Sequence, residues 1–131
     1  MGYRSDVLGL VYGTGTNVDR YIKQHKKVHG DKSVFDLFPA GNNDDNEGIT
    51  IGTTIRDEVE YKYIKLSGSD WKWYDSYEDV QAWEQFMKAS KIYGLEWEFS
   101  RIGEEEQDIE SIKSGSAKDF VYVVRHIYND I

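Results

Sequence analysis

The 131-residue chain contains no cysteine, only one proline (Pro39) and no apolar run as long as a membrane-spanning helix. The absence of cysteine excludes disulfide bonds, thiolate nucleophiles and cysteine-ligated zinc. A membrane span needs about 18 consecutive apolar residues, so we expect none. The N-terminus also lacks the basic and apolar segments of a signal peptide. With no proline-rich linker, we expect a single domain over residues 1–131.

Aromatic residues dominate the apolar part of the composition. The chain has 10 Tyr, 5 Phe and 4 Trp against 2 Met. Because each aromatic side chain buries a large area, a domain of this length can form a core from few residues. We therefore expect an ordered globular domain.

The net charge is −8, and it is unevenly distributed. Residues 1–32 carry six basic and three acidic side chains, whereas residues 95–112 carry seven acidic side chains and one basic. Binding to the phosphate backbone of nucleic acids normally requires clustered Lys and Arg. We therefore expect no direct nucleic-acid partner.

Residue patterns predict an α+β domain. Strands are expected at 7–12, 49–55, 59–66, 95–99 and 120–128. Helices are expected from Asn17 to Gly30 and from Ser76 to Gly94, with a turn at 67–70. In the strand at 95–99, strict alternation predicts that Glu96 and Glu98 point outward. The economical packing is a mainly antiparallel sheet with two helices on one face, ferredoxin-like or a close variant.

Three motifs resemble ligand sites without completing them. The turn at 13–16 precedes a helix but lacks the lysine of a phosphate-binding loop. His25 and His29 have zinc-ligand spacing but no third ligand nearby. The stretch from Asn43 to Gly48 resembles the first half of a calcium loop, with Thr54 where a glutamate should close it. We expect no metal, no cofactor and no catalytic residue.

The acidic stretch after the strand at 95–99 is the strongest candidate for a binding surface. A run of carboxylates is usually a solvated face. Spaced carboxylates also compete with nucleic-acid phosphates for a basic partner surface. The candidate partner-binding residues are Glu104, Glu105, Glu106, Asp108 and Glu110.

A second candidate surface is the group of aromatic residues between positions 61 and 74. Aromatic side chains on a sheet either join the core or stack on flat ligands, and the sequence leaves both readings open. In the ligand reading, Tyr61 and Trp73 would stack on a base, and Lys23 or Lys26 would contact phosphates. The aromatic group consists of Tyr61, Tyr63, Trp71, Trp73 and Tyr74.

Three segments resemble motifs of small proteins encoded by tailed bacteriophages. They are Gly2–Val7 (GYRSDV), Trp73–Val80 (WYDSYEDV) and Arg101–Glu104 (RIGE) followed by Asp108–Glu110 (DIE). The resemblance implies a phage or prophage product that acts in the host bacterial cytoplasm. It implies no active site.

These observations together favour a non-enzymatic accessory protein. The leading hypothesis is that it binds and inhibits a host protein, such as an immune effector or a nucleic-acid enzyme, through its acidic surface. One alternative is a module that sequesters a nucleotide signal, and another is a structural component of the virion. We expect no membrane partner, and the sequence leaves homo-oligomerisation open.

Overall fold

The computed structural model describes residues 4–39, 47–105, 107–123 and 127–129. Five strands form an antiparallel sheet in the order β2-β3-β1-β4-β5, and two short strands pair separately. The strands are β1 (Ser5–Gly13), β2 (Gly48–Arg56), β3 (Val59–Trp71), β4 (Glu96–Gly103), β5 (Ile109–Lys113), β6 (Val121–Val123) and β7 (Ile127–Asn129). The helices are α1 (Gly15–His29), α2 (Val34–Leu37) and α3 (Glu78–Ala89), with short 3-10 turns at Gly30–Lys32 and Ser90–Tyr93.

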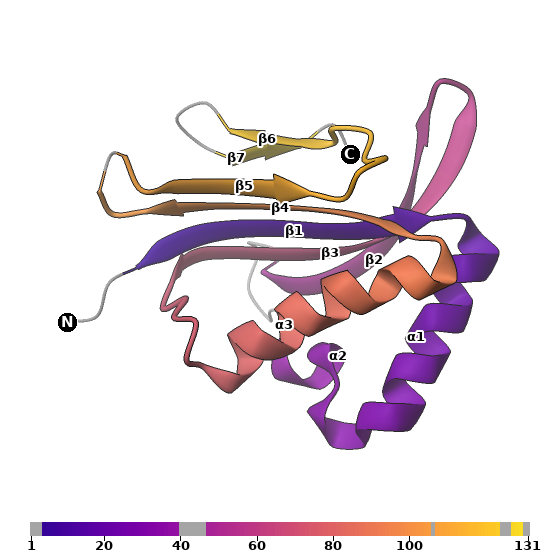
Figure 1. The fold of residues 1–131 in the computed structure, drawn as a ribbon, viewed down its shortest axis with the longest axis horizontal. Coiled ribbons are helices and arrows are strands. Elements are labelled where there is room, and N and C mark those ends of the chain that lie inside the picture. Colours follow the sequence, from indigo (N-terminus) through magenta and orange to yellow (C-terminus); the bar gives the residue numbers. More distant parts are fainter. Residues whose placement is uncertain (1–3, 40–46, 106, 124–126, 130–131) are drawn as a thin grey trace.

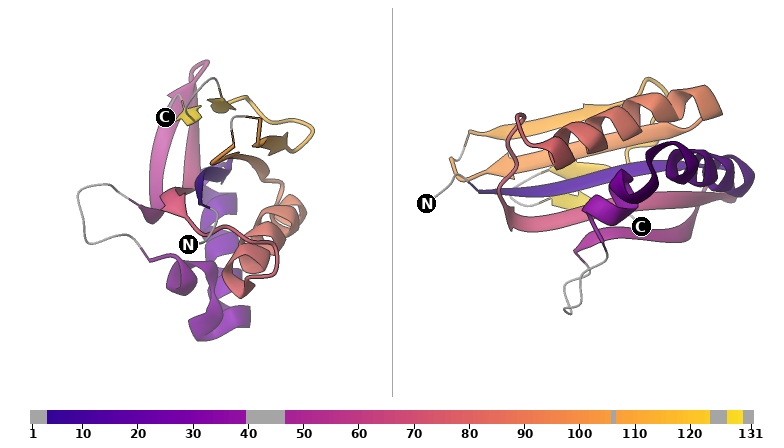
Figure 2. Two further views of the ribbon diagram at one scale, coloured as in Figure 1. Left: turned by 90° about the vertical axis from the view of Figure 1, so that its left-hand side faces the viewer. Right: turned by 90° about the horizontal axis from the view of Figure 1, so that it is seen from below.

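The elements form three layers (Figure 1). The helices cover one face of the five-stranded sheet, and the β6–β7 pair covers part of the other (Figures 1 and 2). The predicted α+β class and the placement of both main helices on one face are confirmed. The order β1-α1-β2-β3-α3-β4, with β1 between β3 and β4, is a split βαβ arrangement. Assignment to the ferredoxin-like fold stays a prediction.

The larger core lies between the sheet and the helices. Trp83 of α3 is fully buried, and its indole ring lies over Gly9 in the middle of β1. A Cβ atom at position 9 would lie 2.7 Å from Trp83 Cζ2, so this strand position requires glycine. Tyr21 of α1 donates a 2.6 Å hydrogen bond to the Phe86 carbonyl oxygen and stacks on the Phe86 ring, which joins α1 to α3.

A smaller core lies on the opposite face of the sheet. Leu8, Leu10 and Tyr12 of β1 pack there against Phe120 and Val121. The expectation of a single strand at 120–128 is wrong, because this segment contains the separate strands β6 and β7. The two strands cover apolar side chains that β1 presents on its second face, which explains why β1 is apolar throughout.

Several predicted boundaries are also corrected. Helix α1 begins earlier than expected, since Thr14 is its N-cap and Thr14 Oγ1 accepts a hydrogen bond from the Asn17 N–H. The turn predicted at 67–70 is absent, because β3 continues to Trp71 and pairs with β1 there. Strand β5 was not predicted, because all five of its residues are exposed and lack a buried apolar face.

Candidate functional site: the acidic end of the sheet

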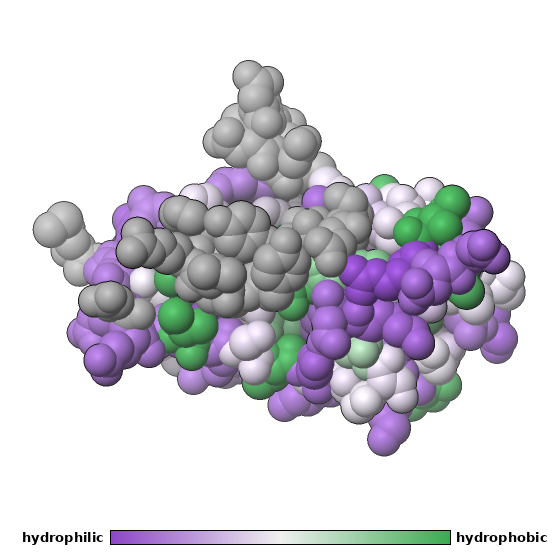
Figure 3. Space-filling view, turned by 90° about the horizontal axis from the view of Figure 1, so that it is seen from above, coloured by the Kyte–Doolittle hydropathy of each residue, from purple (hydrophilic) through white to green (hydrophobic). Residues whose placement is uncertain are grey.

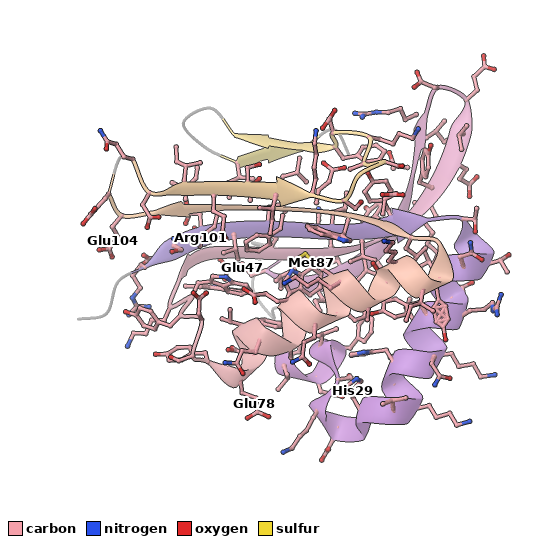
Figure 4. The ribbon with its side chains drawn as sticks, viewed as in Figure 1. His29, Glu47, Glu78, Met87, Arg101 and Glu104 are labelled. Carbon is pink, nitrogen blue, oxygen red and sulfur yellow. The ribbon has the colours of Figure 1, made fainter. Side chains whose placement is uncertain are left out.

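Carboxylates from four separate segments meet at one end of the sheet. At this end β1 begins, β3 finishes and β4 turns into β5, so that Ser5 pairs with both Trp71 and Gly103. Figure 4 shows Glu104 and Arg101 at this end, with Glu47 nearer the middle of the sheet. We call this group the acidic end; it consists of Asp6, Glu47, Asp70, Glu104, Glu105 and Asp108.

Hydrogen bonds hold these segments together. Asp6 Oδ1 accepts the Asp70 N–H at 2.9 Å, and Glu104 Oε1 accepts the Arg4 N–H at 2.9 Å. Glu47 accepts the Ser69 N–H at 2.9 Å through Oε1. Because each bond joins segments far apart in the sequence, the carboxylates are positioned by the fold rather than by a flexible tail.

Asp108 has a different role from its neighbours. Arg101 donates two hydrogen bonds to the Asp108 carboxylate, at 2.8 and 3.0 Å, and a third to Ser5 Oγ at 3.2 Å. The side chains of Arg101 and Asp108 are 18% and 31% exposed. A two-point arginine–carboxylate pair combines charge neutralisation with fixed geometry. Asp108 therefore stabilises the turn between β4 and β5, and its charge is largely compensated.

The acidic end keeps an excess of negative charge after this pairing. Asp6, Asp70, Glu104 and Glu105 are exposed. Among the described residues, the basic side chains near this group include Arg4, whose guanidinium donates to the Asp70 carbonyl oxygen at 3.3 Å, the paired Arg101 and the exposed Lys72. Hydrophilic side chains cover much of the left-hand end of the molecule in Figure 3.

The structure places only one of the remaining two predicted partner-binding residues. Glu110 is exposed on β5, opposite Arg101. Glu106 falls outside the residues that the structure describes. The structure thus replaces a linear acidic stretch with a surface to which β1, the end of β3 and the residue before β2 also contribute.

The four residues predicted to bind a nucleotide are not brought together. Trp73 is 8% exposed and stacks on Phe99 in the helix-side core. Tyr61 lies on the other face of the sheet, where it contacts Tyr12 and Phe120. Lys23 and Lys26 are exposed on α1. No base-stacking pair is formed by Tyr61 and Trp73, because the sheet separates them.

The aromatic group at positions 61–74 is therefore mostly part of the two cores. Trp73 is buried, and the other four residues are half-buried. Trp71 stacks on Phe38, with ring centroids 5.8 Å apart. Of the two readings that the sequence left open, the structure favours the core.

His25 and His29 line a groove of about 420 Å³ between α1 and α3. His25 is 8% exposed, and its Nε2 accepts the Val34 N–H at 3.0 Å. Burial and the neighbouring His29 lower the pKa of His25 to about 4, so the ring is neutral near pH 7. Among the described residues, no group of three or more His, Asp or Glu is arranged to hold a metal ion.

The other two motifs gain no support as ligand sites. Thr14, within the turn at 13–16, caps α1 through its side-chain oxygen. Asn43 and Asp45 of the calcium-like stretch lie outside the described residues. Glu47, from the same stretch, bonds Ser69 and belongs to the acidic end.

Sequence reasoning missed the role of Glu98. Glu98 was predicted to point outward into solvent, and this is wrong. The face of the sheet on which it lies is covered, and Glu98 is only 2% exposed. Its carboxylate accepts hydrogen bonds from the Tyr12 hydroxyl and from the N–H groups of Phe120 and Val121. Two features of the sequence indicated that a second layer covers this face: the apolar start of the segment at 120–128 and the apolar residues on both faces of the strand at 7–12.

No protein-family model, curated protein or solved structure matches the chain. Within the described ranges, no helix combines the length and hydrophobicity needed to cross a membrane.

Proposed function

We propose that this protein is a non-enzymatic binding protein that docks its acidic end onto a basic surface of a partner protein. The observation that carries the proposal is the convergence of carboxylates from separate segments on one end of the sheet, where hydrogen bonds from backbone N–H groups join those segments. Fixed charges at an interface steer association and set the orientation of the partner. A rigid acidic surface also competes well for a site that normally holds phosphates, because little conformational entropy is lost on binding.

The resemblance to tailed-phage proteins supports a partner in the bacterial host. A phage product that occupies a basic substrate site would inhibit the host enzyme or immune effector to which that site belongs. Action in the host cytoplasm is part of the same proposal. The nucleotide-sequestering alternative is not proposed further, because the residues on which it depended lie on opposite faces of the sheet.

The test begins with capture of partners from bacterial lysate on the immobilised protein. Specific partners should be released as ionic strength rises, because exposed charge pairs are screened by salt. The released proteins should carry a basic functional surface, and adding the protein should inhibit their activity. The proposal would be contradicted if no protein were retained, or if the retained proteins were not released as the salt concentration rises.

A further inference from the structure

The two edges of the five-stranded sheet differ in how they are protected. Strand β5 has five residues, two of them charged (Glu110 and Lys113). Strand β2 has nine residues, and its only charged residue, Arg56, is the last. Proteins usually protect exposed edge strands with charged residues, proline or short length. Edge β5 has such protection, whereas residues 51–55 of β2 contain neither a charged residue nor proline.

The backbone of β2 shows which groups face outward. The Ile49 N–H donates a 2.9 Å hydrogen bond to the Phe38 carbonyl oxygen, outside the sheet, and therefore points away from β3. The N–H and C=O groups of a strand point to alternate sides from one residue to the next. Ile51, Thr53 and Ile55 therefore also present their N–H and C=O groups on the outer edge.

The side chains of the same three residues are exposed. Ile51 is 46% and Ile55 is 70% exposed, and Thr53, between them, is exposed as well. All three lie on the helix-covered face of the sheet, as does Ile49, which pairs with the buried Leu66.

This arrangement is symmetric about Thr53. If two β2 strands pair antiparallel around a two-fold axis at Thr53, each Ile51 lies opposite the Ile55 of the other copy on the same face. Directly opposed side chains in an antiparallel pair lie roughly 4.5–5.5 Å apart and stabilise the sheet when both are apolar. A surface that matches itself about a two-fold axis is the requirement for an isologous dimer.

We infer that the protein forms a homodimer through antiparallel pairing of β2 with the β2 of a second copy. The strands join into one continuous ten-stranded sheet centred on Thr53, with residues 51–55 of each copy paired. Asp57 and Glu58, at the tip of the hairpin, lie outside the paired segment.

Electrostatic repulsion between two copies is weakest at this edge. Each chain has a net charge of −8 and repels another copy over most of its surface, but the paired segments are uncharged. The two-fold axis also places the two acidic ends at opposite ends of the joined sheet. The dimer thus keeps both acidic ends accessible and apart.

Sedimentation equilibrium of three proteins tests the inference. The wild-type chain should sediment at twice its 15.2 kDa mass. Thr53→Lys should sediment as a monomer, because it places two like charges directly opposite each other at the two-fold axis. The control, Ile112→Lys, puts the same charge on the β5 edge at a residue that is 43% exposed, and should remain dimeric.

Thr53→Pro provides a second variant that does not depend on charge. Because the Thr53 N–H points outward, proline there removes no bond to β3, and the circular dichroism spectrum of the monomer should be unchanged. A monomeric wild-type protein, or a dimer that persists in both Thr53 variants, would overturn the inference.

Discussion

The Tyr12 hydroxyl lies 2.6 Å from the Glu98 carboxylate, inside the core that β1 and β4 share with the C-terminal segment. The same hydroxyl accepts the Lys118 N–H, and the carboxylate accepts the N–H groups of Phe120 and Val121. Burial and the bond to Glu98 raise the pKa of Tyr12. This pair ties the segment that leads into β6 to the middle of the sheet.

Glu98→Gln should loosen the C-terminal segment. The two carboxylate oxygens of Glu98 accept the Phe120 and Val121 N–H groups, one each. In glutamine an NH₂ group replaces one of these oxygens, so one backbone N–H would face a donor. Loss of a buried, charged acceptor should reduce the free energy of unfolding by about 2–3 kcal/mol. Urea denaturation measures this loss, and hydrogen exchange should quicken at the Phe120 and Val121 amides. Exchange as slow as in the wild type would contradict this role of Glu98.

Gly9→Ala should destabilise the fold by about 1–3 kcal/mol, because the added methyl group overlaps the Trp83 indole ring. Trp83→Phe should partly relieve this overlap. It also removes the indole N–H, which is the one buried side-chain polar atom without a hydrogen-bond partner among the described residues. Thermal unfolding of both single variants and the double variant gives the coupling energy. Strictly additive effects would show that the two residues do not press on each other.

His25 should make the fold less stable in mild acid. Its pKa is about 4 when folded against an ordinary value of 6.5, so between these values the unfolded chain binds a proton that the folded chain does not. The free energy of unfolding should therefore fall as the pH drops from about 6.5 to 4, by up to about 3 kcal/mol, and this contribution should level off below pH 4.

Comparison with His25→Gln separates this contribution from that of the carboxylates, which also titrate in mild acid. The glutamine side chain can still accept the Val34 N–H but does not titrate. The difference in stability between wild type and His25→Gln should change across this pH range. A constant difference would rule out His25 as the cause.

The sequence predicted the class of fold because the main helices and the inner strands have clear periodicity. Val18, Tyr21 and His25 recur at helical spacing and are buried on α1. Strand β5 was missed because it is held at an edge by backbone pairing and its side chains are all exposed. The burial of Glu98 was not predicted, because alternation shows which residues share a face of a sheet but not whether another layer covers that face.

The acidic end was predicted only in part, because the sequence does not show which strands lie side by side. Glu104 and Glu105 lie in the acidic stretch that the sequence makes obvious. Asp6 and Asp70 belong to the same surface only because β1 pairs with both β3 and β4. The compensation of Asp108 by Arg101 depends on side-chain geometry across the turn, which no spacing rule indicates.

The most direct test of the acidic end compares two variants with the same change in net charge. In the first, Glu104→Lys and Glu105→Lys are combined with Asp70→Asn at the acidic end. In the matched control, Glu58→Lys and Glu60→Lys are combined with Asp57→Asn at the tip of the β2–β3 hairpin. Asp70 and Asp57 both have positive φ, 60° and 52°, so asparagine suits both positions.

The measurement is the dissociation constant of each variant for the captured partner, by titration calorimetry. We expect the acidic-end variant to bind at least about 100-fold more weakly, since reversing charges at an interface costs several kcal/mol. The hairpin control should bind within a few-fold of wild type. Equal weakening of both variants would mean that only net charge matters, and unchanged binding by the acidic-end variant would contradict the proposed docking surface.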